Sequence, residues 1–209
     1  AGNDYKVIDR TDFPKVEGEF GNVWGVADEY LYKNALTAMD QAHAEGKPFF
    51  THIMTTSNHR PFTYPDGRID IPSPGGRAGS MKYTDYAIGR FLDAARSKAW
   101  FNETLFIFVA DHCASAAGRI RLPVEGFHIP LILYAPALLK PGVDGQVSSQ
   151  LDIAPKRSRE PPREGQPKAG ATIDSGGRTI RLGGGLKEPM LLVGRNSASG
   201  LADLDPRML

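Results

Sequence analysis

Three short apolar runs alternate with two segments of helical periodicity, and this alternation restricts the fold more than any other feature of the chain. The apolar runs are PFFTHIM (48–54), TLFIFVA (104–110) and IPLILY (129–134). Apolar side chains recur at helical spacing over 28–45 and again over 82–97. Strands that alternate with helices of this length predict an α/β fold with a mostly parallel sheet flanked by helices.

Finer expectations follow from the same pattern. Asp28 is expected to cap the first helix, which should stop at Gly46, and residues 55–80 are rich enough in Pro, Gly and Ser to predict an irregular loop. The three apolar runs should lie side by side and parallel in one sheet, because right-handed crossovers through helices return each strand parallel to the last.

The residues expected to face the core are Leu31, Ala35, Met39 and Ala42 in the first helix and Tyr83, Ala87, Ile88, Phe91, Leu92 and Ala95 in the second.

The composition changes sharply near residue 155. All 19 aromatic residues precede position 156, and the segment 156–209 carries 9 Gly and 5 Pro with a net charge of +4. Such a composition predicts little packed core. We therefore divide the chain into a folded part, 1–155, and a tail, 156–209, which is either a disordered basic segment or not the natural continuation, for instance after a shifted reading frame.

Charge and composition exclude some functions. The net charge of +1, without a dense run of Lys and Arg, argues against nucleic acid as a ligand. No apolar stretch approaches the ~20 residues needed to span a bilayer. The single cysteine, Cys113, allows no internal disulfide and is expected to be a small packing residue.

Polar residues follow two of the predicted strands. Asp111 and His112 come directly after 104–110, and the run NHRPF (58–62) lies shortly after 48–54. In open α/β sheets, ligands bind beyond the carboxyl ends of the strands. A carboxylate beside an imidazole suits a divalent transition ion such as Mn²⁺ or Zn²⁺ better than Ca²⁺. Two ligands are too few for a catalytic site, so others must come from other segments.

Several motifs together resemble a known family. The runs PFFTHIMTTSNHRPFTYPDG, TLFIFVADHCASAAGR, IPLILYAP and SQLDIAP, preceded by DYKVIDRTDF and VWGVADEYLYKNAL, occur in the order and spacing of the lipoteichoic acid synthase and phosphoglycerol transferase family. That family belongs to the alkaline phosphatase and sulfatase superfamily. The resemblance covers about residues 1–155 and implies the C-terminal part of a sulfatase-like catalytic domain, hence an incomplete fold. The family continues its last motif with P-T-L-L, whereas this chain reads Pro155-Lys156-Arg157, which favours a foreign tail.

The resemblance implies roles for individual residues. Asp111 and His112 match the Asp-His metal pair, and His59 matches the histidine that contacts the phosphoglycerol group beside the metal. Arg60 is a candidate to neutralise a phosphate, or a solvated loop arginine. His128 is a candidate metal or substrate ligand, or a strand-entry residue. The family's nucleophilic threonine, its metal-binding glutamate and its Trp-x-Arg residues all precede the start of this chain, so we expect them upstream.

The function implied is transfer of a phosphoglycerol group from a phosphatidylglycerol-like lipid to a glycerol or glucan hydroxyl through a phospho-threonine. The expected cofactor is Mn²⁺, with Zn²⁺ or Mg²⁺ as alternatives. The partners are a phospholipid head group and a glycan or glycerol acceptor, at the outer face of the bacterial cytoplasmic membrane, to which helices absent from this chain would tether the enzyme. Two alternatives remain: a sulfate or phosphate ester hydrolase of the sulfatase family, and an inactive fragment with residual metal or anion binding.

Overall fold

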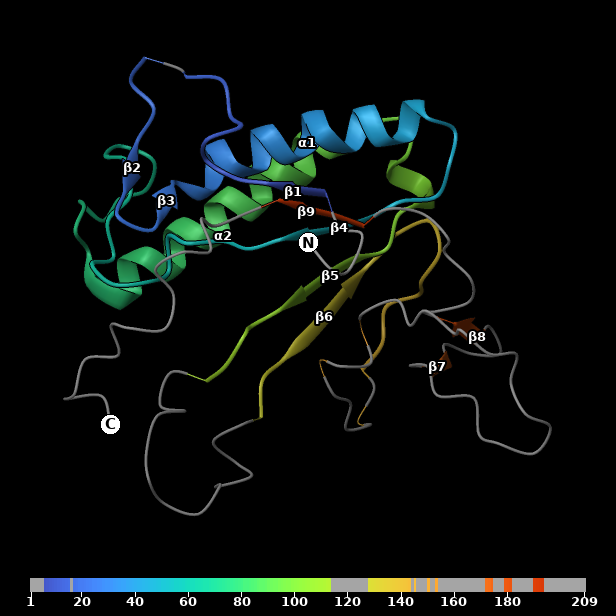
Figure 1. Ribbon diagram of the computed structural model, residues 1–209. Coiled ribbons are helices and arrows are strands. Elements are labelled where there is room, and N and C mark those ends of the chain that lie inside the picture. Colours follow the sequence, from blue (N-terminus) through green and yellow to red (C-terminus); the bar gives the residue numbers. More distant parts are fainter. Residues whose placement is uncertain are drawn as a thin grey trace.

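The computed structural model describes residues 6–15, 17–113, 128–143, 145, 150, 153, 172–174, 179–181 and 190–193. Within them, helices and strands alternate along much of the chain (Figure 1). The elements in order are β1 (Lys6–Ile8), β2 (Gly21–Asn22), β3 (Gly25–Val26), α1 (Asp28–Ala44), β4 (Phe50–Ile53), α2 (Gly76–Ala95), the 3₁₀ helix η1 (Phe101–Glu103), β5 (Phe106–Val109), β6 (Leu131–Tyr134), β7 (Thr172–Asp174), β8 (Thr179–Arg181) and β9 (Met190–Val193).

Helix α1 confirms the first helical prediction, with one difference at its start. Leu31, Ala35 and Met39 are buried along one face, and the backbone N–H of Gly46, at φ +70°, donates to the His43 carbonyl to end the helix. The N-cap residue is Ala27, which makes no side-chain capping bond. Asp28 is therefore the first helical residue and not the cap, because its carboxylate is used elsewhere, as described below.

Helix α2 begins at Gly76, inside the segment that its Pro, Gly and Ser content had predicted to be an irregular loop. The glycines there serve packing. A Cβ on Gly79 would lie 2.2 Å from the hydroxyl oxygen of Tyr64, a buried residue whose ring stacks on Tyr83 at 5.2 Å. Gly79 is thus helical and allows close approach of Tyr64, a reason that composition does not reveal.

The main core lies where α1 and α2 pack on each other and on β5. The Tyr32 and Phe91 rings stack at 4.7 Å, and Phe106 of β5 meets Phe91 edge to face at 5.9 Å. Figure 1 shows the two helices together on one side of the strands. The buried members of this core are Tyr32, Met39, Ala87, Phe91, Ala95, Trp100, Phe101 and Phe106. Most residues of the two predicted apolar faces are buried, whereas Ala42, Ile88 and Leu92 are only partly buried.

Strands β1, β9 and β4 form a parallel sheet in which β9 is central. Thr51 of β4 is opposite Leu191 of β9, which is opposite Lys6 of β1. The central strand thus comes from the segment predicted as a tail. Most of 156–209 lies outside the described residues, so the two-part division of the chain stays a prediction.

The expectation of three parallel strands in one sheet is wrong for the last two. Strands β5 and β6 pair antiparallel, with Phe106 opposite Tyr134 and Val109 opposite Leu131, and they form a sheet separate from the one containing β4. The end of β5 lies beside the start of β6, the arrangement of a chain that turns back on itself. Ile132 is 57% exposed, so β6 is also less buried than its apolar sequence predicted.

Among the residues that the structure describes, no helix is long and apolar enough to cross a membrane.

Alanine substitutions at two glycines of α2, Gly79 and Gly89, should change the free energy of unfolding in opposite directions, because only Gly79 lies against Tyr64. Gly79→Ala should lower the free energy of unfolding by about 2 kcal/mol, because the new methyl group overlaps the Tyr64 hydroxyl. Gly89→Ala should raise it by up to about 1 kcal/mol, because a Cβ on the exposed Gly89 would have no atom within 4 Å and alanine favours helix. Urea unfolding followed by circular dichroism measures both. Equal effects at the two positions would contradict the packing role of Gly79.

Candidate functional site

Asp111 and His112 lie directly after β5, and the two residues contact each other. The His112 backbone N–H donates to Asp111 Oδ1 at 3.0 Å, and His112 Nε2 lies 3.5 Å from Asp111 Oδ2. His112 Nδ1 lies 2.7 Å from the Cys113 carbonyl oxygen. Because a carbonyl only accepts, Nδ1 carries a proton, and Nε2 is the unprotonated nitrogen of the neutral ring.

This pair fits a chelated divalent cation. Two ligand atoms at about 2.1 Å from a tetrahedral zinc ion are roughly 3.4 Å apart, close to the observed 3.5 Å between Nε2 and Oδ2. The backbone bond at Nδ1 orients the ring as second-shell bonds orient metal-bound histidines. The two side chains are 73% and 63% exposed, which leaves room for further ligands. In the part of the chain that the structure describes, no third acidic, histidine or cysteine side chain completes a metal cluster.

Two further segments meet the Asp111–His112 pair. The Cys113 thiol donates to the His128 carbonyl oxygen at 3.3 Å, which places the His128 backbone beside Cys113, the residue that follows the pair. Gln150 Nε2 donates to the carbonyl oxygens of Ala110 and Asp111, at 2.5 and 3.1 Å. Sequence reasoning did not single out Gln150, although it lies in the quoted SQLDIAP run. It binds the backbone at the end of β5, from which Asp111 projects.

His59 and Arg60 lie in the loop after β4, and a tight backbone turn carries them. The His59 N–H donates to the Thr56 carbonyl at 3.1 Å, and the Phe62 N–H donates to the His59 carbonyl at 2.8 Å. His59 Nδ1 lies 2.9 Å from the Arg60 carbonyl oxygen, so this nitrogen also carries the proton. Both side chains are exposed at the surface of the loop.

Trp24 contacts the loop of the candidate residue His59, and sequence reasoning did not single it out. Its ring centroid lies 4.0 Å from that of His59, and its Nε1 donates to the Arg60 carbonyl at 2.5 Å. Asn22 connects the same β2–β3 hairpin to the loop, because its Nδ2 donates to Thr63 Oγ1 at 3.1 Å. The hairpin therefore packs on the loop that carries His59.

Phe62 marks a strained position in this loop. Its φ is +60°, which a bulky residue adopts only when its surroundings compel it. The Arg77 guanidinium lies 5.4 Å from the centre of its ring, a cation–π distance. Backbone strain of this kind clusters at functional sites, which agrees with a role for the loop.

The stem of the same loop is held by a buried carboxylate. Asp28 is fully buried, and its Oδ1 accepts the backbone N–H groups of Thr56 and Ser57, both at 3.0 Å. Its Oδ2 accepts the Thr84 hydroxyl at 3.3 Å, and its own N–H donates to Ser57 Oγ at 3.1 Å. Burial raises the pKa of the Asp28 carboxyl, although these hydrogen bonds favour its charged form.

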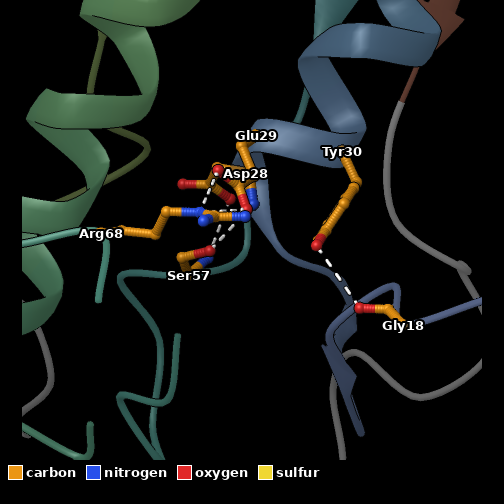
Figure 2. A network of polar contacts seen from close by, with 6 residues as sticks. All are labelled: Gly18, Asp28, Glu29, Tyr30, Ser57 and Arg68. Carbon is orange, nitrogen blue, oxygen red and sulfur yellow. Dashed lines mark hydrogen bonds and ion pairs between the residues drawn. The ribbon is translucent and has the colours of Figure 1, made fainter. Parts of the chain in front are cut away.

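Figure 2 shows Asp28 and Ser57 side by side at the start of α1, with Arg68 reaching Glu29 next to them. Arg68 Nε lies 2.9 Å from both carboxylate oxygens of Glu29, and Tyr30 of the same turn donates to the Gly18 carbonyl at 3.5 Å. The first turn of α1 therefore binds the loop after β4 through charged and polar groups.

The contacts arrange the predicted site residues in two groups. Asp111, His112 and His128 form one group, and His59 and Arg60, with Trp24, form the other. In Figure 1, β4 and β5 run towards the same side of the molecule. The sequence predicts that both groups face one cleft, on the premise that the strands before them are parallel neighbours. Strands β4 and β5 lie in separate sheets, so this premise is wrong and the shared cleft stays a prediction.

Comparison with known proteins identifies a matching family and similar proteins. The family model described as Sulfatase matches residues 3–157. The lipoteichoic acid synthase of Staphylococcus saprophyticus is 26% identical over 114 residues, which cover 51% of this chain and 17% of that protein. An arylsulfatase of Clostridium perfringens is 35% identical over 86 residues, covering 37% of this chain and 18% of that protein. The chain thus spans less than a fifth of the length of either relative.

A solved structure shows the same fold. A crystal structure from Vibrio parahaemolyticus, described as a protein in the alkaline phosphatase superfamily, is 37% identical with a TM-score of 0.54. It covers 60% of this chain, which covers 31% of it. The predicted α/β fold of the alkaline phosphatase and sulfatase type is therefore confirmed.

The Asp28 contacts predict that the His59 loop depends on a carboxylate outside it. Asp28→Ala should lower the free energy of unfolding by about 2–4 kcal/mol, because it leaves the buried N–H groups of Thr56 and Ser57 without their acceptor. These two amides should also exchange faster with deuterium. Asp93→Ala is the control, since Asp93 makes an exposed ion pair with Arg96 and its loss should cost less than about 0.5 kcal/mol. Unchanged exchange at Thr56 and Ser57 would contradict the role given to Asp28.

Proposed function

Because the chain belongs to the sulfatase family, we propose that it supplies part of the active site of a metal-dependent enzyme that transfers a phosphoglycerol group. The observation that carries the proposal is the pairing of Asp111 Oδ2 and His112 Nε2 at 3.5 Å, a separation that fits two ligands of one cation. The loop motif around His59 and the similarity to a lipoteichoic acid synthase support the choice of substrate.

Asp111 and His112 would hold the cation, for which Mn²⁺ is the first choice and Zn²⁺ or Mg²⁺ are the alternatives. When bound, a divalent cation stabilises charge on phosphate oxygens and lowers the pKa of a coordinated hydroxyl. The neutral Nε2 of His112 and the carboxylate of Asp111 provide the donor types that such an ion needs. Further ligands would come from outside the described residues.

His59 and Arg60 would hold the transferred group. His59 Nε2 is the ring nitrogen left for a ligand, since Nδ1 is bound to the Arg60 carbonyl. Arg60 brings a planar cation able to face a phosphate. His128, whose carbonyl oxygen accepts from Cys113 next to the proposed metal pair, is proposed as a further ligand of the metal or substrate.

The reaction proposed has two displacements at phosphorus. A threonine hydroxyl from the upstream part of the protein loses its proton and forms a bond to phosphorus as the bond to the diacylglycerol oxygen breaks, and that oxygen takes up one proton. The acceptor hydroxyl of the glycerol or glucan then loses its proton and forms the new ester bond, as the bond to the threonine oxygen breaks and that oxygen is protonated again. His59 would keep the phosphoglycerol group in line through both steps.

The proposed substrates indicate where the enzyme acts. A phospholipid head group and a glycan or glycerol acceptor meet at the outer face of the bacterial cytoplasmic membrane, and we place the enzyme there, held by membrane helices outside this chain. Residues 1–155 would be the C-terminal part of the catalytic domain. We propose that the segment 156–209 is a tail outside the natural domain, although its strand β9 pairs with β1 and β4 in the structure.

A second candidate is hydrolysis of a sulfate or phosphate ester. The 35% identity to an arylsulfatase favours it, although over only 86 residues. The two activities differ in the nucleophile and in the acceptor, which is water in hydrolysis. A third candidate, from another class, is an inactive fragment that keeps weak metal or anion binding.

The test uses the full-length product of the gene that encodes this chain, in membranes containing phosphatidylglycerol. We expect Mn²⁺-dependent release of diacylglycerol, which Asp111→Ala and His112→Ala each reduce by at least about tenfold, since the loss of a residue that merely supports a metal ligand already costs roughly 10–100-fold. His43→Ala is the matched control, because His43 is an exposed histidine in the last turn of α1 and should leave activity unchanged.

Three outcomes contradict the proposal. Metal-dependent hydrolysis of an aryl sulfate without diacylglycerol release would favour the sulfatase reaction. Full activity of Asp111→Ala would remove the metal pair from the mechanism. Turnover of a chromogenic phosphodiester by the 209-residue chain alone, lost in Asp111→Ala, would show that the nucleophile lies within this chain.

A further inference from the structure

The carbonyl oxygen of Arg60 accepts two side-chain N–H groups. His59 Nδ1 lies 2.9 Å from it and Trp24 Nε1 lies 2.5 Å from it. A carbonyl oxygen has two lone pairs, so both donors can bind at once. The bond fixes the neutral His59 ring as the Nδ1–H tautomer and leaves Nε2 as its unprotonated nitrogen.

The Trp24 ring limits the orientation of the same imidazole. The two ring centroids are 4.0 Å apart and their planes are inclined by 50°. The last torsion of a histidine side chain is intrinsically broad, so an exposed ring on a loop samples many orientations unless a neighbour restrains it. His59 is restrained by a hydrogen bond at Nδ1 and by the indole ring next to it.

Trp24 is itself anchored to the loop. Its backbone N–H donates to Asn22 Oδ1 at 2.8 Å, and Asn22 Nδ2 donates to Thr63 Oγ1 at 3.1 Å. The hairpin β2–β3 therefore contacts the loop at Arg60 and at Thr63, on both sides of Phe62. Such double attachment holds the indole in place beside His59.

We propose that Trp24 is a positioning residue, which holds the His59 imidazole in one tautomer and one orientation so that Nε2 meets the substrate phosphoglycerol group. The proposal rests on the proposed function, in which His59 contacts that group. Trp24 acts through His59 and the Arg60 carbonyl, and it needs no substrate contact of its own.

The test uses the 209-residue chain labelled with ¹⁵N-histidine. Long-range ¹H–¹⁵N spectra, recorded with the imidazole neutral, distinguish the two ring tautomers. We expect a single Nδ1–H tautomer for His59 in the wild type and a mixture in Trp24→Leu. Val23→Ala is the matched control, because Val23 is the neighbouring hairpin residue and is 84% exposed. If Trp24→Leu disturbs the fold, Trp24→Phe asks the same question, since it keeps an aromatic ring and removes the N–H donor.

A binding measurement separates this proposal from the proposed function. Titration with glycerol phosphate in the presence of Mg²⁺ should show roughly two- to tenfold weaker binding to Trp24→Leu, the loss expected for a disturbed hydrogen bond. His59→Ala should lose at least as much. A single tautomer and unchanged affinity in Trp24→Leu, with weak binding by His59→Ala, would overturn the positioning role and leave the proposed function standing. Wild-type affinity in His59→Ala would instead overturn the proposed function of His59.

Discussion

The carboxylate of Asp28, buried at the first turn of α1, joins the segments on which the His59 loop depends. It accepts the N–H groups of Thr56 and Ser57 after β4 and the hydroxyl of Thr84 on α2. A buried charge without partners would destabilise the fold, so each of these contacts is needed to offset its desolvation. The result is a loop whose stem is fixed by two helices, while its tip carries an exposed imidazole.

The helices were predictable from the sequence because each buries one face. Leu31 and Phe91 recur in apolar stripes at helical spacing, and both are buried in the structure. The start of α2 was not predictable, because Gly79 is helical for a packing reason and glycine usually indicates a turn. The antiparallel pairing of β5 and β6 was also missed, since apolar strands carry no signal of direction and only the connection between them sets it.

The chemical groups of the site were easier to predict than their supports. Asp111, His112 and His59 stood out because motifs at strand ends carry them. Trp24 and Gln150 did not, because each acts on a backbone carbonyl far away in the sequence, 36 residues away in the case of Trp24 and Arg60. Such contacts depend on the folded arrangement of segments and leave no periodic pattern. Sequence reasoning thus selected candidate groups from their motifs, whose contact with a substrate stays a prediction, and it missed the residues that bind the backbone beside them.

The two loops share one active site only if a metal held by Asp111 and His112 lies close to the His59 ring. Mn²⁺ is paramagnetic and broadens the NMR signals of nearby nuclei, an effect that falls steeply with distance. Titration of the histidine-labelled chain with Mn²⁺ should therefore broaden the ring signals of both His112 and His59 and leave those of His43 sharp. Broadening of His112 alone, with His59 as sharp as His43, would show that the two loops belong to separate sites.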